Sequence, residues 1–185
     1  MRIVGGKYKG RYFTPKKSFG ARPTTDIAKE ALFNILINRV DFEELSALDL
    51  FAGSGSIGYE FISRGAKNVS FVEKNYSHVQ FIKKVTGELG IENAQIIRDD
   101  VFRFLKKFPG KFDIVFADPP YDLKHLSKIP SAVFASGILK ENGLFILEHP
   151  KGYNFSRQPG FKEIRNYGKV NFSFFTAPSK ENSNG

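Results

Sequence analysis

A carboxylate, two prolines and an aromatic ring stand side by side in Asp118-Pro119-Pro120-Tyr121, directly after the apolar run 112–117. A central β-strand cannot continue through two prolines, so the chain must leave its sheet here, at the edge where α/β proteins bind ligands. Each proline holds the preceding residue in extended geometry, which fixes the Asp118 carboxylate and the Pro119 carbonyl as neighbouring acceptors. Together they can accept both N–H bonds of an exocyclic nucleobase amine and leave its lone pair available, while Tyr121 stacks on the base. The alternative is a stiff loop without a ligand.

A glycine-rich loop follows an earlier apolar run, 47–51, and has the pattern G-x-G-x-x-G at Gly53, Gly55 and Gly58. Glycines at a strand-to-helix junction allow positive φ and let a ligand approach the backbone, and the helix that follows offers unpaired N–H groups. Glu73 ends the next apolar run, 20 residues after Gly53, where a carboxylate can accept hydrogen bonds from ribose hydroxyls. The pattern predicts an adenosine-bearing cofactor, and both NAD and S-adenosylmethionine are compatible with it. A tight structural turn is the alternative.

Short apolar runs alternate with amphipathic runs from residue 45 onward, which is typical of parallel strands covered by helices on both faces. We expect strands at 45–51, 68–73, 94–98, 112–117 and 143–148, and helices near 57–64, 76–89, 101–107 and 124–137. Two further β-rich runs, 161–167 and 170–176, flank the turn candidate Gly168-Lys169 and predict an antiparallel hairpin that closes the sheet. The sequence therefore predicts an α/β fold with a mostly parallel sheet.

Positive charge is concentrated at the start of the chain. There are 28 Lys and Arg against 19 Asp and Glu, a net charge of +9, and residues 1–22 hold seven of the basic residues and no acid. Such a segment binds a polyanion by displacing its counterions, and the aromatic residues between the charges offer stacking surfaces for unpaired bases: Tyr8, Tyr12, Phe13 and Phe19. The pattern around Gly5-Gly6 predicts a short hairpin that holds these charges and binds nucleic acid. A solvated basic tail without a ligand is the alternative.

A helix is expected to join this hairpin to the rest of the chain. Thr24 or Thr25 can cap it, and its apolar face is formed by residues at helical spacing: Ile27, Ala31, Leu32, Ile35 and Leu36. We therefore expect a basic hairpin and helix over residues 1–40, a catalytic domain over 41–177 and a disordered tail over 178–185.

Composition excludes several classes of protein. Without cysteine, the chain has no disulfide, thiolate metal site or cysteine nucleophile. His78 and His125 lie in helical surface patterns and His149 follows the fifth strand, so we assign none of them a role and expect no metal. No apolar run approaches the roughly 20 residues that span a bilayer, so we expect no membrane partner and a cytoplasmic location.

Together these motifs resemble the class I S-adenosylmethionine-dependent methyltransferases, which have a Rossmann-like fold. Within that class the sequence resembles the RsmD family of small-subunit (16S) ribosomal RNA guanine-N2 methyltransferases, over residues 2–176. Many amino-methyltransferases share the glycine loop and the proline turn. The basic opening 3–11 and the segment Arg22-Pro23-Thr24-Thr25-Asp26 are more particular to this family, and further matches lie at 48–55, 63–66, 71–73 and 167–168.

The resemblance implies a seven-stranded sheet with an antiparallel last strand and S-adenosylmethionine bound over Gly53 and Gly55. It places Asp49 near the methionine end of the cofactor, Glu73 on the ribose and Asp100 on the adenine amine; Asp99 is adjacent, and a helix cap is the alternative role there. The implied cofactor site comprises Asp49, Phe51, Gly53, Ser54, Gly55, Glu73, Asp100 and Val101.

The resemblance also implies a catalytic group and an RNA-binding group of residues. The catalytic group comprises Asp118, Pro119 and Tyr121, and the RNA-binding group comprises Lys7, Lys9, Arg11, Arg22 and Thr24. The implied partner is small-subunit ribosomal RNA, either free or in the assembled small (30S) subunit, and we expect the enzyme to be a monomer.

Three alternatives stay open. Adenine-N6 methylation of DNA or RNA uses the same proline turn, and only the resemblance favours guanine N2. An NAD-dependent oxidoreductase would use the same glycine loop but would need neither the proline turn nor the basic hairpin. A non-catalytic RNA-binding or assembly factor is the third reading.

Overall fold

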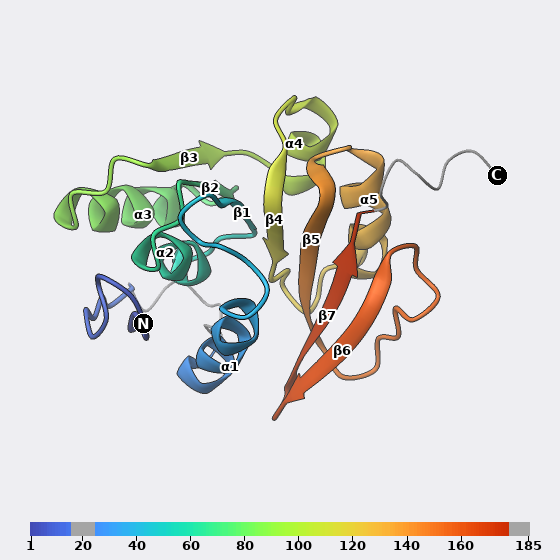
Figure 1. Ribbon diagram of the computed structural model, residues 1–185. Helices are drawn as coiled ribbons and strands as arrows, with labels where there is room; N and C mark the ends of the chain where they lie inside the picture. Colours follow the sequence, from blue (N-terminus) through green and yellow to red (C-terminus); the bar gives the residue numbers. More distant parts are fainter. Residues whose placement is uncertain (16–24, 178–185) are drawn as a thin grey trace.

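A seven-stranded β-sheet runs through the structure, a computed structural model that describes residues 1–15 and 25–177 (Figure 1). In the spatial order β3-β2-β1-β4-β5-β7-β6, the strands are β1 (Ser46–Leu50), β2 (Asn68–Glu73), β3 (Ala94–Arg98), β4 (Phe112–Ala117), β5 (Leu139–Pro150), β6 (Phe161–Tyr167) and β7 (Val170–Thr176). Neighbours from β3 to β5 are parallel, whereas β7 is antiparallel to both β5 and β6. The expected fold class and the closing hairpin are confirmed.

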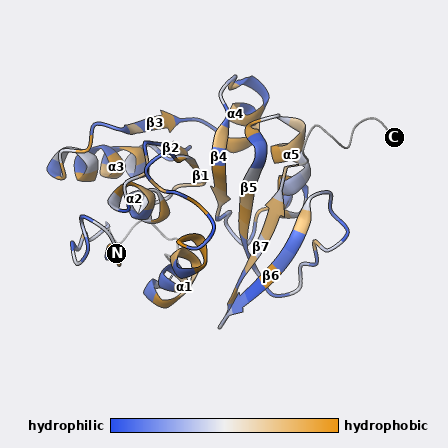
Figure 2. Cartoon of the chain, in the orientation of Figure 1, coloured by the Kyte–Doolittle hydropathy of each residue, from blue (hydrophilic) through white to orange (hydrophobic). Residues whose placement is uncertain are grey.

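Helices cover both faces of this sheet. One hydrophobic cluster includes residues of α1 (Asp26–Leu36), α2 (Ser56–Ser63) and α3 (Tyr76–Glu88); the other includes residues of α4 (Val101–Lys107), the 3-10 helix η2 (Leu126–Lys128) and α5 (Ile129–Ala135). Because β1 and β4 are covered on both faces, their sequences are nearly continuous apolar runs. Figure 2 shows these central strands as hydrophobic and the edge strand β6 as largely hydrophilic.

Two elements differ clearly from the sequence-based expectation, while other boundaries differ from it by one or two residues. The helix expected at 124–137 is divided into η2 and α5, because Pro130 lies in the first turn of α5 and has no N–H for a continuous helix. Strand β5 begins at Leu139 instead of residue 143, since an irregularity in its pairing with β4 accommodates Asn142 at φ 55°.

The buried face of α1 is also different from the predicted one. Thr25 is the N-cap, as one of the two predicted candidates, and its Oγ1 accepts a hydrogen bond from the Ala28 amide at 3.3 Å. The predicted face is wrong at Ile27, which is 78% exposed, and the fully buried side chains are Ala28, Lys29, Leu32, Phe33 and Leu36. The helix is turned so that Lys29 reaches a carboxylate on α2 and Phe33 packs edge-on against Phe61.

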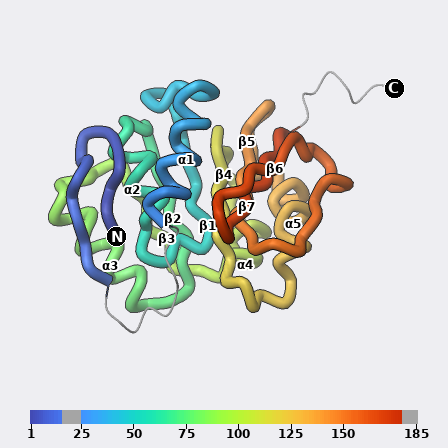
Figure 3. Tube along the Cα trace, turned by 90° about the horizontal axis from the view of Figure 1, so that it is seen from below, coloured from blue at the N-terminus to red at the C-terminus, as the bar shows by residue number. Residues whose placement is uncertain are grey.

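The N-terminal residues form the expected hairpin, which packs against α2. An antiparallel bridge joins Arg2 to Tyr12, and the Ile3 amide donates to the Arg11 carbonyl at 3.0 Å. Ile3 and Phe13 are buried in the same cluster as α1 and α2. Figures 1 and 3 both place the hairpin beside α2, on the outer side of the helices that cover this face. The division into domains near residue 40 stays a prediction, and the tail 178–185 lies outside the described residues.

Candidate active site

The strand register brings the glycine loop and the proline turn to one point of the sheet. Leu50, the last residue of β1, pairs with Ala117, the last residue of β4, so the two chains leave the sheet side by side at about the 4.8 Å spacing of neighbouring strands. Strand order reverses between β1 and β4, which is the place where open α/β sheets bind ligands. The two motifs, far apart in sequence, therefore lie side by side at the carboxyl edge of the sheet, where a ligand crevice is expected.

The glycine loop has the backbone geometry of a ligand-binding turn. Gly53 and Gly55 have φ values of 55° and 81°. A Cβ on Gly55 would lie 2.8–2.9 Å from the Tyr59 ring, so only glycine fits there, whereas a Cβ on Gly53 would meet nothing closer than 3.8 Å. Phe51 adopts φ 60°, a conformation that strains a bulky residue by about 1–3 kcal/mol and is concentrated at functional sites. The space beside the Cα of Gly53 is thus open, whereas the space beside the Cα of Gly55 is filled by the Tyr59 ring.

Glu73 ends β2 beside this loop, where the sequence predicts it. Its Oε2 accepts a hydrogen bond from the Gly53 amide at 2.8 Å, and its Oε1 accepts one from the Asn75 amide at 2.7 Å. These bonds hold the carboxylate at the loop, and each oxygen keeps a second lone pair that can accept from a ribose hydroxyl. His78 Nδ1 lies 3.6 Å from Glu73 Oε2 and is buried, so the predicted surface position of this histidine is wrong.

Asp49 lies under the loop and takes the place of a missing helix cap. The N-cap of α2 is Gly55, which has no side chain, and Asp49 Oδ2 accepts from the Gly58 amide in the first turn of α2 at 3.0 Å. Burial raises the pKa of Asp49 to about 7; the Gly58 N–H opposes this shift and the charge of Glu73 adds to it. A cation bound nearby would therefore favour the ionised form of Asp49 near neutral pH.

This raised pKa makes a prediction about stability. The folded pKa lies above the unfolded value, so the stabilising contribution is complete below about pH 4 and is lost as the pH rises through about 7, on the order of 4 kcal/mol in total. Asp49→Asn keeps an acceptor for Gly58 and has no charge to bury. Urea unfolding of the cofactor-free protein at about pH 5 and about pH 8, on either side of that pKa, is expected to show a smaller loss of stability in the variant. Equal losses would contradict the assignment.

Asp100 and Val101 are at the end of β3, beside the crevice. Asp100 is the N-cap of α4, and its Oδ1 accepts from the amides of Phe102 and Arg103 at 3.0 and 3.2 Å. Of the two neighbouring acids Asp99 and Asp100, it is therefore Asp100 that caps the helix. Its side chain is also solvent-exposed, so a ligand can reach it. Val101 is buried at the start of α4. Contact of either residue with adenine stays a prediction.

The three residues of the proline turn that the sequence singled out differ in their exposure. Asp118 is half-buried, Pro119 is buried and Tyr121 is 50% exposed. The Pro120 carbonyl accepts from the Leu123 amide at 2.9 Å and closes a turn, while no hydrogen bond among the described residues reaches the Pro119 carbonyl. Whether the Pro119 oxygen accepts from a ligand stays a prediction. The catalytic roles of Asp118, Pro119 and Tyr121 stay predictions.

Two hydroxyl groups beside the loop were not identified from the sequence. Ser56 Oγ and Tyr59 OH are buried and have no hydrogen-bond partner in the part of the chain that the structure describes. A buried polar group without a partner costs about 1–3 kcal/mol. Burial and the charge of Asp49 raise the pKa of Tyr59, so it stays a neutral donor. Unpartnered hydroxyls next to an open glycine loop fit a polar cofactor, and the indication in the sequence is a tyrosine in the otherwise apolar helix that follows the loop.

Comparison with known proteins identifies the family. The family model described as Conserved hypothetical protein 95 matches residues 1–176. Ribosomal RNA small subunit methyltransferase D of Haemophilus influenzae is 37% identical over 82% of this chain and 79% of its own length. The protein of the same name from Buchnera aphidicola (subsp. Baizongia pistaciae) is 30% identical over 95% of this chain and 91% of its own. The chain belongs to the ribosomal RNA small subunit methyltransferase D family.

A solved structure agrees with this assignment. The hypothetical protein TTHA0928 of a Thermus species is 31% identical and superposes with a TM-score of 0.84 over 95% of this chain and 98% of its own. The similarity to the RsmD family inferred from the sequence is thus confirmed, and with it the methyltransferase class. The reading as an NAD-dependent oxidoreductase is discarded.

In this methyltransferase D family member, the predicted RNA-binding residues are spread along the hairpin. Lys7, Lys9 and Arg11 are exposed, and Arg22 and Thr24 lie outside the described residues. The prediction of interleaved stacking surfaces needs correction. Phe13 is buried in the core, and Tyr8 is half-buried with its hydroxyl 3.3 Å from the Leu89 carbonyl, because the hairpin needs apolar residues to pack on the helices. Tyr12 remains 68% exposed, and Phe19 is outside the described residues.

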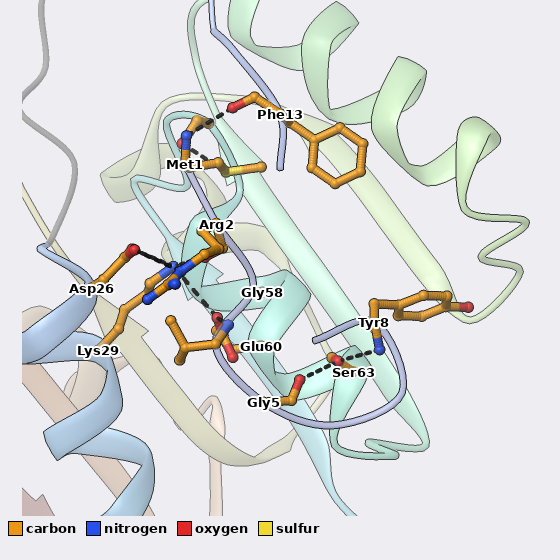
Figure 4. Close-up of polar contacts among 12 residues, drawn as sticks. Met1, Arg2, Gly5, Tyr8, Phe13, Asp26, Lys29, Gly58, Glu60 and Ser63 are labelled. Carbon is orange, nitrogen blue, oxygen red and sulfur yellow. Dashed lines mark hydrogen bonds and ion pairs between the residues drawn. The ribbon is translucent and has the colours of Figure 1, made fainter. Parts of the chain in front are cut away.

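A buried ion pair that the sequence analysis missed fixes the hairpin in place (Figure 4). Glu60, fully buried in α2, accepts from the Val4 amide at 2.7 Å and pairs with Lys29 Nζ at 3.4 Å and with Arg64. Lys29 Nζ also donates to the Arg2 carbonyl. The indication in the sequence is that both charges lie on helix faces that are otherwise apolar. Hairpin, α1 and α2 are thereby joined around one pair of charges.

The remaining histidines differ in their surroundings. His149 is buried, with its ring nitrogens 2.8 Å from Ser173 Oγ and 2.9 Å from the Pro150 carbonyl, and burial lowers its pKa. It is therefore a neutral core residue, whereas His125 is exposed. Among the described residues, no helix has the length and apolar character required to cross a bilayer.

Proposed function

We propose that this protein transfers the methyl group of S-adenosylmethionine to the exocyclic N2 amine of a guanine in small-subunit ribosomal RNA. The pairing of Leu50 with Ala117 carries the proposal, because the glycine loop and Asp118-Pro119 follow these two residues and leave the sheet side by side. Methyltransferase D relatives with 30–37% identity are named for this substrate class.

Several residues of the chain fit S-adenosylmethionine. Glu73 would accept from the ribose, Asp100 from the adenine amine, and the backbone at Gly53 would lie against the cofactor. The carboxyl edge is rich in carboxylates, with Asp49, Glu73, Asp99, Asp100, Asp118 and Glu148 at or near the ends of successive strands. An acidic edge favours a ligand that carries a sulfonium and an ammonium group. The cofactor supplies a methyl group that is already activated by the positive sulfur.

The residues of the proline turn then have a positioning role. The Asp118 carboxylate and the Pro119 carbonyl accept the two N–H bonds of the amine, which turns its lone pair toward the crevice. Tyr121 stacks on the base and fixes its plane. Holding the reacting atoms in line in this way is worth roughly 7–11 kcal/mol of the barrier. The proton released from the nitrogen leaves to water after transfer, so no covalent enzyme intermediate and no metal are required.

One experiment tests the function. Unmodified small subunits and naked small-subunit ribosomal RNA are incubated with the protein and S-adenosylmethionine, and the nucleosides are identified by mass spectrometry. N2-methylguanosine is the expected product, and the comparison of the two substrates shows whether the assembled subunit is required. If the product is N6-methyladenosine, the enzyme is an adenine-N6 methyltransferase instead. If no methylated nucleoside is found, the protein is better explained as an RNA-binding assembly factor.

The exposed charges of the hairpin make a prediction about salt dependence. Each phosphate contact on single-stranded RNA contributes about 0.7 to the slope of log affinity against log salt concentration. Arg11→Ala is expected to reduce that slope by about this amount, measured by fluorescence anisotropy with a ribosomal RNA fragment. Lys106→Ala, an exposed position on α4, is the matched control. An unchanged slope for Arg11→Ala would remove this residue from the RNA-binding surface.

A ribosomal substrate also agrees with the expected cytoplasmic location. We further propose that the protein acts as a monomer, which light scattering coupled to gel filtration can test.

A further inference from the structure

A pocket of about 640 Å³ lies away from the proposed methyl-transfer site, at the far end of α2 from the glycine loop. It is formed by the tip of the hairpin, the second half of α1, Phe42 and the last residues of α2, Ile62 to Ser63, with Arg64 and Gly65. Helix α2 begins at the glycine loop and has eight residues, so the pocket is about 12 Å from that loop. We call it the hairpin-tip pocket; the function proposed above does not use it.

The hairpin tip is held rigidly over this pocket. The Lys7 amide donates to the Ser63 carbonyl at 2.6 Å, and Ser63 Oγ donates to the Gly5 carbonyl at 2.5 Å. Gly6 has φ 71°, and a Cβ there would lie 1.8 Å from the Ser63 carbonyl oxygen, so the tip is pressed directly onto the end of α2. Lys7 and Lys9 therefore project from a backbone that is already ordered before any ligand binds.

The lining of the pocket combines positive charge with apolar surface. Lys7, Lys9 and Arg64 stand against one acid, Glu30. Arg64 is fixed by its ion pair with Glu60 and by the Phe33 ring, whose centroid is 4.2 Å from the guanidinium carbon. Apolar side chains complete the lining: Phe33, Ile37, Phe42 and Ile62, of which Ile37 is 65% exposed. Single-stranded nucleic acid needs this combination, since cations track the phosphates and an apolar surface takes an unstacked base.

We propose that the hairpin-tip pocket is a second RNA subsite, which holds a single-stranded nucleotide of the substrate at a distance from the methylated base. This inference rests on the proposed function. The pocket is about 12 Å from the glycine loop, so a stacked strand must extend at least three or four nucleotides, at about 3.4 Å each, from the loop to reach it. Exposed cations lead there, because Arg11 lies on a strand of the hairpin and Lys7 and Lys9 lie at its tip, while Arg2 is paired with Asp26 at 3.1 Å. The base of the hairpin reaches the glycine loop, where Ser54 Oγ lies 3.5 Å from Met1 Sδ.

The test uses two transcripts of the methylated segment, after mass spectrometry has located it. The long transcript has about ten nucleotides on each side of the target, and the short one has about two, which is fewer than the distance to the pocket requires. For Lys7→Ala/Lys9→Ala we expect KM for the long transcript to rise about tenfold and the salt slope of binding to fall by about 1.4, with kcat and the Kd for S-adenosylmethionine unchanged. The short transcript, which does not reach the pocket, is expected to give the same KM as with the wild type.

Control variants separate this effect from a general loss of charge or stability. Lys106→Ala/Lys107→Ala removes the same charge from exposed positions of α4 and is expected to leave KM unchanged. Ile37→Asp places a negative charge at the pocket and is expected to raise KM for the long transcript, whereas Ile164→Asp, at an exposed position of β6, is not. Unfolding by urea checks that each variant is folded.

The outcomes distinguish the two proposals. If the wild type methylates the long transcript and the pocket variants leave its KM unchanged, the second subsite is wrong while the proposed function stands. If the variants impair methylation of small subunits but not of the long transcript, the pocket binds a ribosomal protein and the RNA subsite is overturned. If the wild type methylates neither transcripts nor subunits, it is the proposed function that fails.

Discussion

Replacing Asp118 with alanine is expected to lower kcat about a hundredfold or more and to change the Kd for S-adenosylmethionine by less than about threefold. Asp118 directly follows β4, and the proposed function assigns its carboxylate to the substrate amine, so its loss is expected to remove an acceptor from the substrate side only. Without it, one N–H bond of the amine has no partner, and the nitrogen is no longer held in line with the methyl group. Single-turnover methylation and calorimetric titration of the cofactor measure the two quantities.

Asp118→Asn is the informative companion, because the amide keeps an acceptor oxygen at the same position. It is expected to retain turnover within about tenfold of the wild type. Asp122→Ala, at an exposed position just beyond the turn, is the neutral control. A collapse of cofactor binding in Asp118→Ala would show that this residue belongs to the cofactor side, and the assignment would be wrong.

Glu73→Ala is expected to have the converse effect, with a weaker Kd for the cofactor and little change in kcat at saturation. The structure adds a reason beyond the lost ribose contact. Glu73 also accepts from the Gly53 amide, so its removal frees the loop itself. Glu73→Gln keeps an acceptor for that amide and separates the two contributions.

The second large effect is expected at Glu60. Glu60→Ala leaves the buried Lys29 with only the partly exposed Asp26, at 3.6 Å, as an acidic partner, and it also removes the partner of Arg64. Breaking a buried ion pair typically destabilises a protein by about 3–5 kcal/mol. The Val4 amide also loses its acceptor, so the hairpin is expected to detach before the sheet unfolds. Urea unfolding gives the free energy, and hydrogen exchange at residues 3–11 reports the detachment.

A double-mutant cycle tests whether the pair acts as a unit. Lys29→Met/Glu60→Gln removes both charges, and its loss of stability is expected to be clearly smaller than the sum of the two single losses. Glu44→Ala, at an exposed position paired with Lys67, is expected to change stability by less than about 1 kcal/mol. Additive losses for Lys29 and Glu60 would mean that each charge is stabilised by other partners.

Anchoring of the hairpin also bears on the substrate. The Lys29–Glu60 pair is on the inner side of the hairpin, and the cations proposed to meet RNA are on its exposed side. The pair therefore holds the hairpin against α1 and α2, beside the hairpin-tip pocket. A destabilised hairpin would weaken RNA binding without any change in the residues that touch RNA.

Much of the fold was predictable because its signals are local. Parallel strands covered on both faces are largely apolar, and 68–73 and 112–117 were predicted with the bounds that the structure has. The bounds of the edge strand 94–98 were also predicted, although none of its residues is buried. The glycine loop and the proline turn were also recognisable, since each needs residues with particular backbone geometry at fixed spacing. The buried face of α1 was predicted incorrectly at Ile27. A prediction from hydrophobic spacing counts lysine as exposed, whereas Lys29 is buried because it pairs with Glu60 on α2.

By itself the sequence determined the elements, the family and the chemistry that the two motifs can perform. Backbone geometry and apolar periodicity depend on residues that are close in sequence, so they can be predicted from one sequence alone. Only the tertiary structure decided which distant groups meet: Asp49 as the cap of α2, Glu60 with Lys29, and the hairpin tip on the end of α2. These contacts depend on how layers pack and on which buried charge finds a partner, and no local pattern in the sequence encodes that choice.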